Sequence, residues 1–182
     1  MMNISSKKGL EVQLSKLKSF SDPKVSLEQY TTPSDIAAMA IWHAYMKGDM
    51  EKVSVDLGCG TGILGIGALM MGAKYVFFVD NDEKALDICK DNINKLKSEG
   101  FIGSDYKIIN EDVSQFSEKV DVVLQNPPFG TKVRHADRSF LINAFRLADI
   151  IYTFHKSETS QFVKAICEDH GFVIDEKLDL KM

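Results

Sequence analysis

The chain is poor in cysteine and has no long apolar run, and each scarcity excludes a class of protein. Its 182 residues include three cysteines, Cys59, Cys89 and Cys167. Because they are odd in number and widely spaced, they form neither a disulfide framework nor a zinc cluster, and a reducing cytoplasm is the simplest setting. No apolar run approaches the roughly 18 residues of a membrane-spanning helix, and the N-terminus lacks the apolar segment of a secretion signal.

An excess of positive charge is also absent. Lys and Arg number 22 against 26 Asp and Glu, so the formal net charge is −4, which is not typical of a nucleic-acid-binding protein. The distribution of the cations says more than their total. For the N-terminal lysines we favour a solvated surface, whereas a cluster after residue 129 is placed to contact phosphates. The two groups are Lys7, Lys8, Lys16 and Lys18, and Lys132, Arg134, His135 and Arg138.

Composition and pattern indicate one α/β domain. Hydrophobic residues make up 45% and charged residues 26% of the chain, as in an ordinary soluble globular protein with one sizeable core. Strand and helix patterns alternate without an internal repeat, which predicts three layers and a mainly parallel sheet. The expected strands are 53–57, 75–79, 107–109 and 120–124, with further strands starting at 151–153 and 172–174. The expected helices are 7–19, 33–47, 63–71, 82–97, 139–150 and 159–169.

A glycine-rich loop, Gly58 to Gly62, joins the strand at 53–57 to the next helix. Glycine at every second position lets the backbone turn sharply and approach a ligand closely. The N-terminus of the following helix offers unpaired N–H groups. The next strand ends in Asp80, where an acidic side chain binds ribose hydroxyls. This order predicts a nucleotide-type pocket.

Two cofactors compete for this pocket. Residues 60–65 fit the G-x-G-x-x-G pattern and Asp80 lies at a suitable distance for NAD. Asp56, two residues before the first glycine, argues against a pyrophosphate and for a cationic ligand. S-adenosylmethionine carries a sulfonium, an amino group and a ribose, so it suits the acidic loop better.

The segment 126–129 reads Asn-Pro-Pro-Phe and directly follows the apolar run 120–124 and Gln125. Its prolines fix φ near −65° and remove two backbone donors, so the turn is stiff and its carbonyls are free to accept. A planar, amine-bearing substrate could stack on Phe129 and donate hydrogens to the Asn126 amide oxygen and the Pro127 carbonyl. Taken alone, the tetrapeptide could equally be a strand end with a surface aromatic.

Together, residues 56–62, Asp80 and 126–129 resemble class I S-adenosylmethionine-dependent methyltransferases of the N6-adenine type. Residues 27–33, 126–132 and 154–157 narrow the resemblance to small ribosomal-RNA N6-adenosine methyltransferases of the methyltransferase-like 5 type. The likeness covers roughly 25–171 and implies a single Rossmann-like domain, 1–182, with a helical extension at 1–24. The sheet of that family ends in an antiparallel hairpin. The chain stops near its start, so we expect an incomplete hairpin or a fragment.

The resemblance also implies roles for individual residues. The catalytic turn would comprise Asn126, Pro127, Pro128 and Phe129. Asp80 would bind the cofactor ribose, Asp112 and Val113 its adenine, and Gln29 and Thr32 would close over its methionine end. Asp112 could instead cap a turn, and Thr32 could cap the helix that starts at Pro33. The full cofactor-binding set is Gln29, Thr32, Gly58, Gly60, Thr61, Ile63, Asp80, Asp112 and Val113, and the RNA-binding set is Lys132, Arg134 and Arg138; no metal is expected.

We therefore expect methyl transfer from S-adenosylmethionine to N6 of an adenosine in RNA, with ribosomal RNA favoured. A protein glutamine N5-methyltransferase stays open, because a side-chain amide presents the same planar NH₂, although those enzymes usually carry Tyr where this chain has Phe129. A non-catalytic RNA-binding subunit also stays open. The resemblance further implies a small zinc-binding activator protein that adds a strand beside 107–109.

Overall fold

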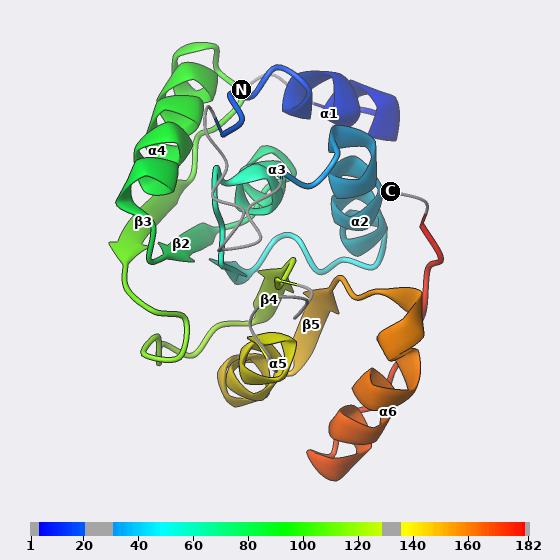
Figure 1. Ribbon diagram of the computed structural model, residues 1–182. Helices are drawn as coiled ribbons and strands as arrows, with labels where there is room; N and C mark the ends of the chain where they lie inside the picture. Colours follow the sequence, from blue (N-terminus) through cyan, green and yellow to red (C-terminus); the bar gives the residue numbers. More distant parts are fainter. Residues whose placement is uncertain (1–3, 21–30, 129–135, 181–182) are drawn as a thin grey trace.

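The computed structural model describes residues 4–20, 31–128 and 136–180, and its strands form one parallel sheet (Figure 1). The five described strands are ordered β3-β2-β1-β4-β5. Their bounds are β1 (Val53–Leu57), β2 (Tyr75–Asp80), β3 (Asp105–Asn110), β4 (Val122–Gln125) and β5 (Ile150–Thr153). The predicted α/β fold is confirmed, and every described strand pair is parallel.

The helices cover both faces of this sheet. They are α1 (Lys7–Leu14), α2 (Ser34–Met46), α3 (Ile63–Met70), α4 (Glu83–Ser98), α5 (Ala136–Leu147) and α6 (Ser160–Asp169), with a 3-10 turn η2 (Ser157–Thr159) before α6. Figure 1 shows α2, α3 and α4 over one face and α5 over the other. None of the helices in the described ranges is both long and apolar enough to cross a bilayer.

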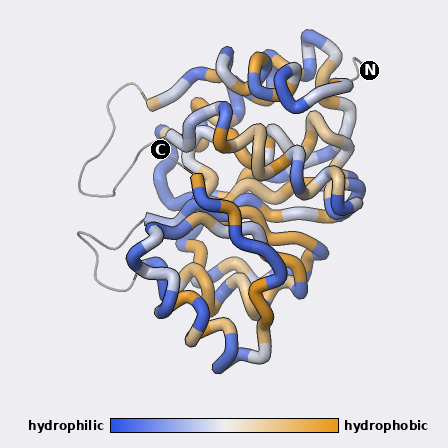
Figure 2. Tube along the Cα trace, turned by 90° about the vertical axis from the view of Figure 1, so that its right-hand side faces the viewer, coloured by the Kyte–Doolittle hydropathy of each residue, from blue (hydrophilic) through white to orange (hydrophobic). Residues whose placement is uncertain are grey.

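Side chains of the central strands pack alternately into two separate hydrophobic cores, one on each face of the sheet. Val122 and Leu124 of β4 pack with the helices of the first face, whereas Val123 packs with Ala144 and Leu147 of α5. This period of two, with both faces buried, explains why β4 is almost continuously apolar. In Figure 2 the apolar stretches run through the middle of the trace, where the sheet lies.

Several predicted boundaries need correction. The helix expected at 7–19 ends at Leu14, after which the N–H groups of Lys16 and Leu17 bond back only three residues and tighten the chain into turns. The helix expected at 139–150 spans Ala136–Leu147 instead. Ile150 belongs to β5, where it pairs with Val122.

The strand expected at 172–174 does not form. Gly171 has a φ of 76° and, with the N–H of Phe172, closes α6 onto the carbonyls of Glu168 and Cys167, which is a common helix ending. The Phe172 ring then stacks on Phe145 with 4.5 Å between centroids, which draws the chain towards α5. Among the described residues the sheet has no antiparallel strand, so none of the expected hairpin is present there.

Candidate active site

The reversal of strand order brings three segments to one edge of the sheet. Leu57, the last residue of β1, pairs with Val79 on one side and with Gln125 on the other. The glycine loop, Asp80 and Asn126 therefore follow neighbouring strand ends. Open α/β sheets bind ligands at such a switch point.

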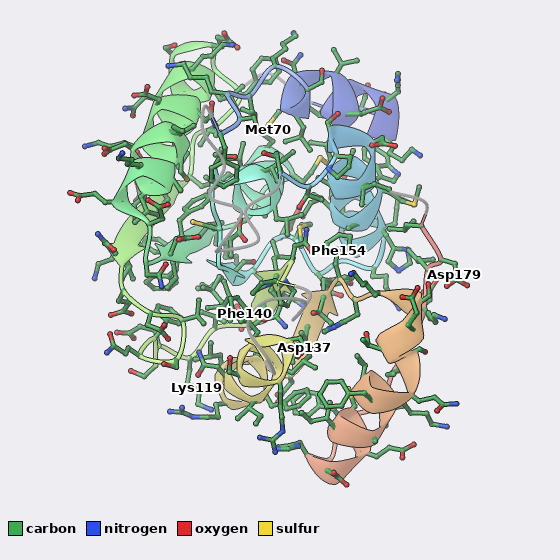
Figure 3. The ribbon with its side chains drawn as sticks, viewed as in Figure 1. Met70, Lys119, Asp137, Phe140, Phe154 and Asp179 are labelled. Carbon is green, nitrogen blue, oxygen red and sulfur yellow. The ribbon has the colours of Figure 1, made fainter. Side chains whose placement is uncertain are left out.

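The backbone of the loop requires its glycines. Gly58, Gly60 and Gly62 have φ values of 66°, 53° and 89°, a left-handed region that other residues enter only at a cost. The Gly58 N–H donates to the Val79 carbonyl at 2.8 Å, which folds the loop back over β2. A Cβ atom on Gly58 would lie 2.8 Å from the Phe140 ring. Figure 3 shows Phe140 between α5 and the sheet.

Asp80 fastens this loop to β2. Its Oδ2 accepts from the Gly60 N–H at 2.8 Å and its Oδ1 from the Asp82 N–H at 2.9 Å. Burial raises the pKa of the Asp80 carboxyl above its ordinary value, against these two hydrogen bonds, which lower it. Each carboxylate oxygen can accept more than one hydrogen bond, so Asp80 keeps capacity for ligand hydroxyls.

Asp56 is a second carboxylate behind the same loop. Its side chain is 2% exposed, and its Oδ2 accepts from the Gly65 N–H in α3 at 2.7 Å. Burial, and to a smaller extent the charge of Asp80, raises the pKa of the Asp56 carboxyl to about 7, against the hydrogen bond from the Gly65 N–H, which lowers it. A cation bound at this edge would be attracted to both carboxylates, whereas an anion would be repelled.

Two other predicted cofactor residues turn their side chains into the core. Thr61 is 3% and Ile63 is 7% exposed. The Thr61 carbonyl accepts from the Asn92 side chain at 3.1 Å, and Ile63 is the first residue of α3. Any contact from these residues to a cofactor therefore comes through the backbone rather than the side chain.

The segment after β3 is held by its own side chains. Asp112 Oδ1 accepts from the Ser114 N–H at 2.9 Å and from its hydroxyl at 2.6 Å. Asp112 thus caps a turn through Oδ1, and its role with adenine stays a prediction. The Val113 carbonyl accepts from the Asn143 side chain of α5. These bonds set the position of the segment beside the pocket.

Asn126, the first residue after β4, has an unusual environment. Its Nδ2 donates to Thr32 Oγ1 at 2.9 Å. Its Oδ1 is buried and has no hydrogen-bond partner among the described residues. A buried acceptor without a partner costs free energy. Ser54 Oγ, Gln125 Oε1 and Asn143 Oδ1 share this property among the described residues. Asn126 differs in following the carboxyl end of a strand at the switch point, where open α/β sheets bind ligands. Pro127 is buried and Pro128 half-buried.

A polar network behind Asn126 was not predicted. Gln125 is fully buried, and its Nε2 donates to Thr153 Oγ1 at 3.0 Å. The same hydroxyl lies 2.9 Å from Nε2 of His155. Burial lowers the pKa of His155, with Asp137 opposing, which favours the neutral ring. The signal in the sequence was a glutamine that ends an otherwise apolar strand.

The remaining predicted site residues lie on the surface or outside the described residues, apart from Thr32. Arg138 is exposed in the first turn of α5. Gln29, Phe129, Lys132 and Arg134 lie outside the described residues. Thr32 does not cap α2, because that helix has Pro33 at its cap and no side-chain capping bond.

The comparisons with known proteins agree with this geometry. The chain belongs to the methyltransferase small-domain family, whose sequence model matches residues 33–147. It is thus a methyltransferase, and S-adenosylmethionine is its methyl donor, as the acidic glycine loop predicted.

Similar proteins narrow the group further. The chain is 35% identical to the rRNA N(6)-adenosine-methyltransferase METTL5 of Danio rerio over 89% of this chain and 80% of the relative. It is 39% identical to the uncharacterized protein MJ0284 of Methanocaldococcus jannaschii over 91% of this chain and 78% of the relative. The crystal structure of PH1948 from Pyrococcus horikoshii, a proposed RNA methyltransferase, matches with a TM-score of 0.87. The match has 44% sequence identity and covers 95% of this chain and 86% of that protein.

The residues at the sheet edge fit this cofactor. The positive-φ glycines leave the loop backbone bare, and a Cβ on Gly60 would already lie 3.0 Å from the Phe20 ring. Asp56 and Asp80 supply negative charge for a sulfonium and an amino group, and Asp80 retains acceptor capacity for ribose hydroxyls.

Proposed function

We propose that the protein transfers a methyl group from S-adenosylmethionine to the N6 amine of an adenosine in RNA, with ribosomal RNA as the favoured substrate. The carrying observation is Oδ1 of Asn126, directly after β4, which is buried and has no hydrogen-bond partner among the described residues. An acceptor in this position suits a donor N–H of the substrate. The likeness to an rRNA N6-adenosine methyltransferase over 89% of the chain supports the choice of substrate.

The cofactor-binding residues are assigned as follows. The backbone of the loop, at Gly58, Gly60, Thr61 and Ile63, lies along the cofactor, and Asp80 accepts from its ribose. Bound S-adenosylmethionine supplies an electrophilic methyl group. Asp112 and the Val113 N–H are assigned to the adenine, and Gln29 to the methionine end.

The catalytic turn then acts on the amine of the base. The N6 lone pair of adenine is spread into the ring, so the amine is a weak nucleophile. Acceptance of its hydrogens by Asn126 Oδ1 and the Pro127 carbonyl favours a pyramidal nitrogen and stabilises the positive charge that develops there. Stacking on Phe129 contributes about 1–3 kcal/mol to holding the base. The adenosine must be unpaired or flipped to reach this turn.

A cationic track along α5 is suited to the RNA backbone. Arg138 and Arg146 lie two helical turns apart, about 12 Å along the axis. They border a cleft of about 240 Å³ whose lining also includes Ser114, Ile142 and Asn143. Neither guanidinium has an ion-pair partner within the described ranges, and Lys119 lies beside α5 (Figure 3), where its Nζ donates to the Arg146 carbonyl. Arg138 lies in the first turn of α5, whereas Arg146 and Lys119 lie near the amino end of β4, where the Val120 N–H donates to the Leu147 carbonyl. Exposed cations along α5 match phosphate contacts; Lys132 and Arg134 are assigned the same role.

The proposal also includes a partner protein and a cellular location. β3 is an outer strand of the described sheet and pairs only with β2 there, so it is the edge at which a small zinc-binding activator protein would add a strand. The three cysteines are free and buried, which suits a cytoplasmic location.

The decisive experiment replaces Asn126. The purified protein is incubated with labelled S-adenosylmethionine and unmodified ribosomal RNA, and N6-methyladenosine is measured by mass spectrometry of nucleosides. We expect Asn126→Ala to slow transfer roughly 100-fold to 1,000-fold, the cost of losing one charge-stabilising partner, while calorimetry still detects cofactor binding.

Asn94→Ala, at an exposed position of α4, is the matched control and should be fully active. Near-normal turnover of Asn126→Ala would refute the role of this side chain. A parallel incubation with a peptide release factor tests the glutamine alternative, because label in the protein rather than in RNA would favour it. A wild-type protein that binds the cofactor but methylates neither would indicate a non-catalytic subunit.

A further inference from the structure

Thr32 touches the proposed catalytic residue although it lies far from it in sequence. The two residues are separated by 94 positions, and Thr32 Oγ1 accepts from Asn126 Nδ2 at 2.9 Å. Thr32 is 5% exposed, so water competes little for its hydroxyl. The hydroxyl makes no capping bond to α2. A helix cap therefore does not account for Thr32.

The orientation of the Asn126 amide decides whether the site can accept. A side-chain amide has one acceptor edge and one donor edge of nearly equal shape. With Nδ2 held at Thr32, Oδ1 is the free edge, and it is buried without a partner among the described residues. The reverse orientation would present two N–H donors to the donor hydrogens of an amine, and that arrangement repels. Since a threonine hydroxyl can accept or donate, Thr32 anchors the amide in place, and the substrate amine favours the orientation with Oδ1 outward.

Both partners are held on stiff backbone. Thr32 precedes Pro33, whose carbonyl accepts from the Ala37 N–H at 2.9 Å in the first turn of α2. α2 in turn packs into the core through Ala37, Ala38 and Ile41. On the other side, Asn126 follows β4 and precedes two prolines, whose φ angles are fixed. The spacing between the hydroxyl and the amide is thus set by the packing of α2 against the sheet.

We infer that Thr32 is a positioning residue: it anchors the Asn126 amide through Nδ2, and Oδ1 is then the edge that accepts from the amine of the substrate. This role rests on the proposed function, and it differs from the contact with the methionine end of the cofactor expected from the sequence. A positioning residue affects the rate of transfer, whereas a cofactor contact affects cofactor affinity.

Thr32→Val tests the role, because it keeps the shape of the side chain and removes the hydroxyl. We expect kcat to fall roughly 10-fold to 100-fold, the order that loss of an oriented group costs, with unchanged KM for RNA and unchanged Kd for S-adenosylmethionine. Thr32→Ser keeps the hydroxyl and should restore kcat to within about 3-fold of wild type. In the Asn126→Ala background, Thr32→Val should cost nothing further, because residues that act as a unit are not additive.

The other outcomes are equally informative. Full kcat in Thr32→Val would overturn the inference, and so would a weaker cofactor Kd with normal kcat, which would assign Thr32 to the cofactor. Thermal unfolding of each variant identifies a folding defect; if Thr32→Val does not fold, Thr32→Ala is compared with Thr32→Ser in its place. A wild-type protein that methylates no adenosine refutes the proposed function itself, whereas an active wild type with an equally active Thr32→Val refutes only the role of Thr32.

Discussion

The two halves of the pocket are built in different ways. The half formed by β1, the glycine loop and β2 comes from one stretch of chain, residues 53–80, and its key bond joins Gly60 to Asp80 over 20 positions. The half that contains Asn126 is completed by Thr32 over 94 positions. A local strand–loop–helix unit can therefore be recognised from spacing, whereas the acceptor of the catalytic turn depends on how distant elements pack.

The largest effect is expected at Gly58. It tests whether the half formed by residues 53–80 is independent of the rest of the chain, because Phe140, next to Gly58, comes from α5. Gly58→Ala should lower the free energy of unfolding by about 1–2 kcal/mol for the left-handed backbone, plus the cost of moving the ring that lies 2.8 Å from the new Cβ. Urea denaturation measures the change, and calorimetry should show weaker cofactor binding.

Gly100→Ala is the matched control for this change. Gly100 has a φ of 78° and no atom within 4 Å of its Cβ position, so it carries the backbone strain without the clash. Equal losses in the two variants would mean that Phe140 moves aside at no cost. Phe140→Leu should relieve part of the extra loss in Gly58→Ala, since residues in contact are not additive.

Asp56 makes the local half sensitive to pH. The pKa of its carboxyl is raised by burial from 3.8 to about 7, so the folded protein binds more protons than the unfolded chain in this range. The stability from this group is fully present below pH 4 and is lost as the pH rises to about 7. Asp56→Asn keeps an acceptor for the Gly65 N–H and removes the titration. Wild type should therefore lose stability relative to Asp56→Asn between pH 4 and 7, as measured by urea unfolding.

The exposed Asp87 of α4 provides the control, since Asp87→Asn should follow the pH profile of wild type. Parallel profiles for wild type and Asp56→Asn would contradict the effect assigned to burial. Saturating S-adenosylmethionine should reduce the difference between the two proteins at pH 7, because a bound cation favours the charged carboxylate.

The smallest effect is expected from replacing the arginines of the cationic track on α5, the helix beyond the Asn126 half of the pocket. Arg138→Ala and Arg146→Ala should each reduce the slope of log affinity for RNA against log salt by about 1 and leave kcat unchanged. Filter binding over a salt series measures the slope. Lys84→Ala, exposed at the start of α4, should leave it unchanged; the same result for both arginine variants would remove α5 from the RNA-binding surface.

Sequence reasoning was most successful where one element carries its own pattern. The strands ending at Leu57 and Asp80 and the helices at 63–70 and 83–98 follow from apolar runs, glycines and an acidic cap. It was less successful where the conformation of a segment depends on contacts with other elements of the fold. Phe172 is a residue type common in strands, yet its N–H closes α6 and its ring stacks on Phe145. Asp112 caps a turn through Oδ1, which accepts from the Ser114 N–H two residues away, and its role at the adenine stays a prediction.

The sequence by itself determined the family, the cofactor loop and the candidate catalytic turn, because glycines, prolines and an acid at set spacing constrain the backbone locally. Only the tertiary structure decided which edge of the Asn126 amide is free, and that Gln125, Thr153 and His155 form a network behind it. The physical reason is that a buried hydrogen bond needs two groups brought together by packing, and packing depends on elements that are remote along the chain.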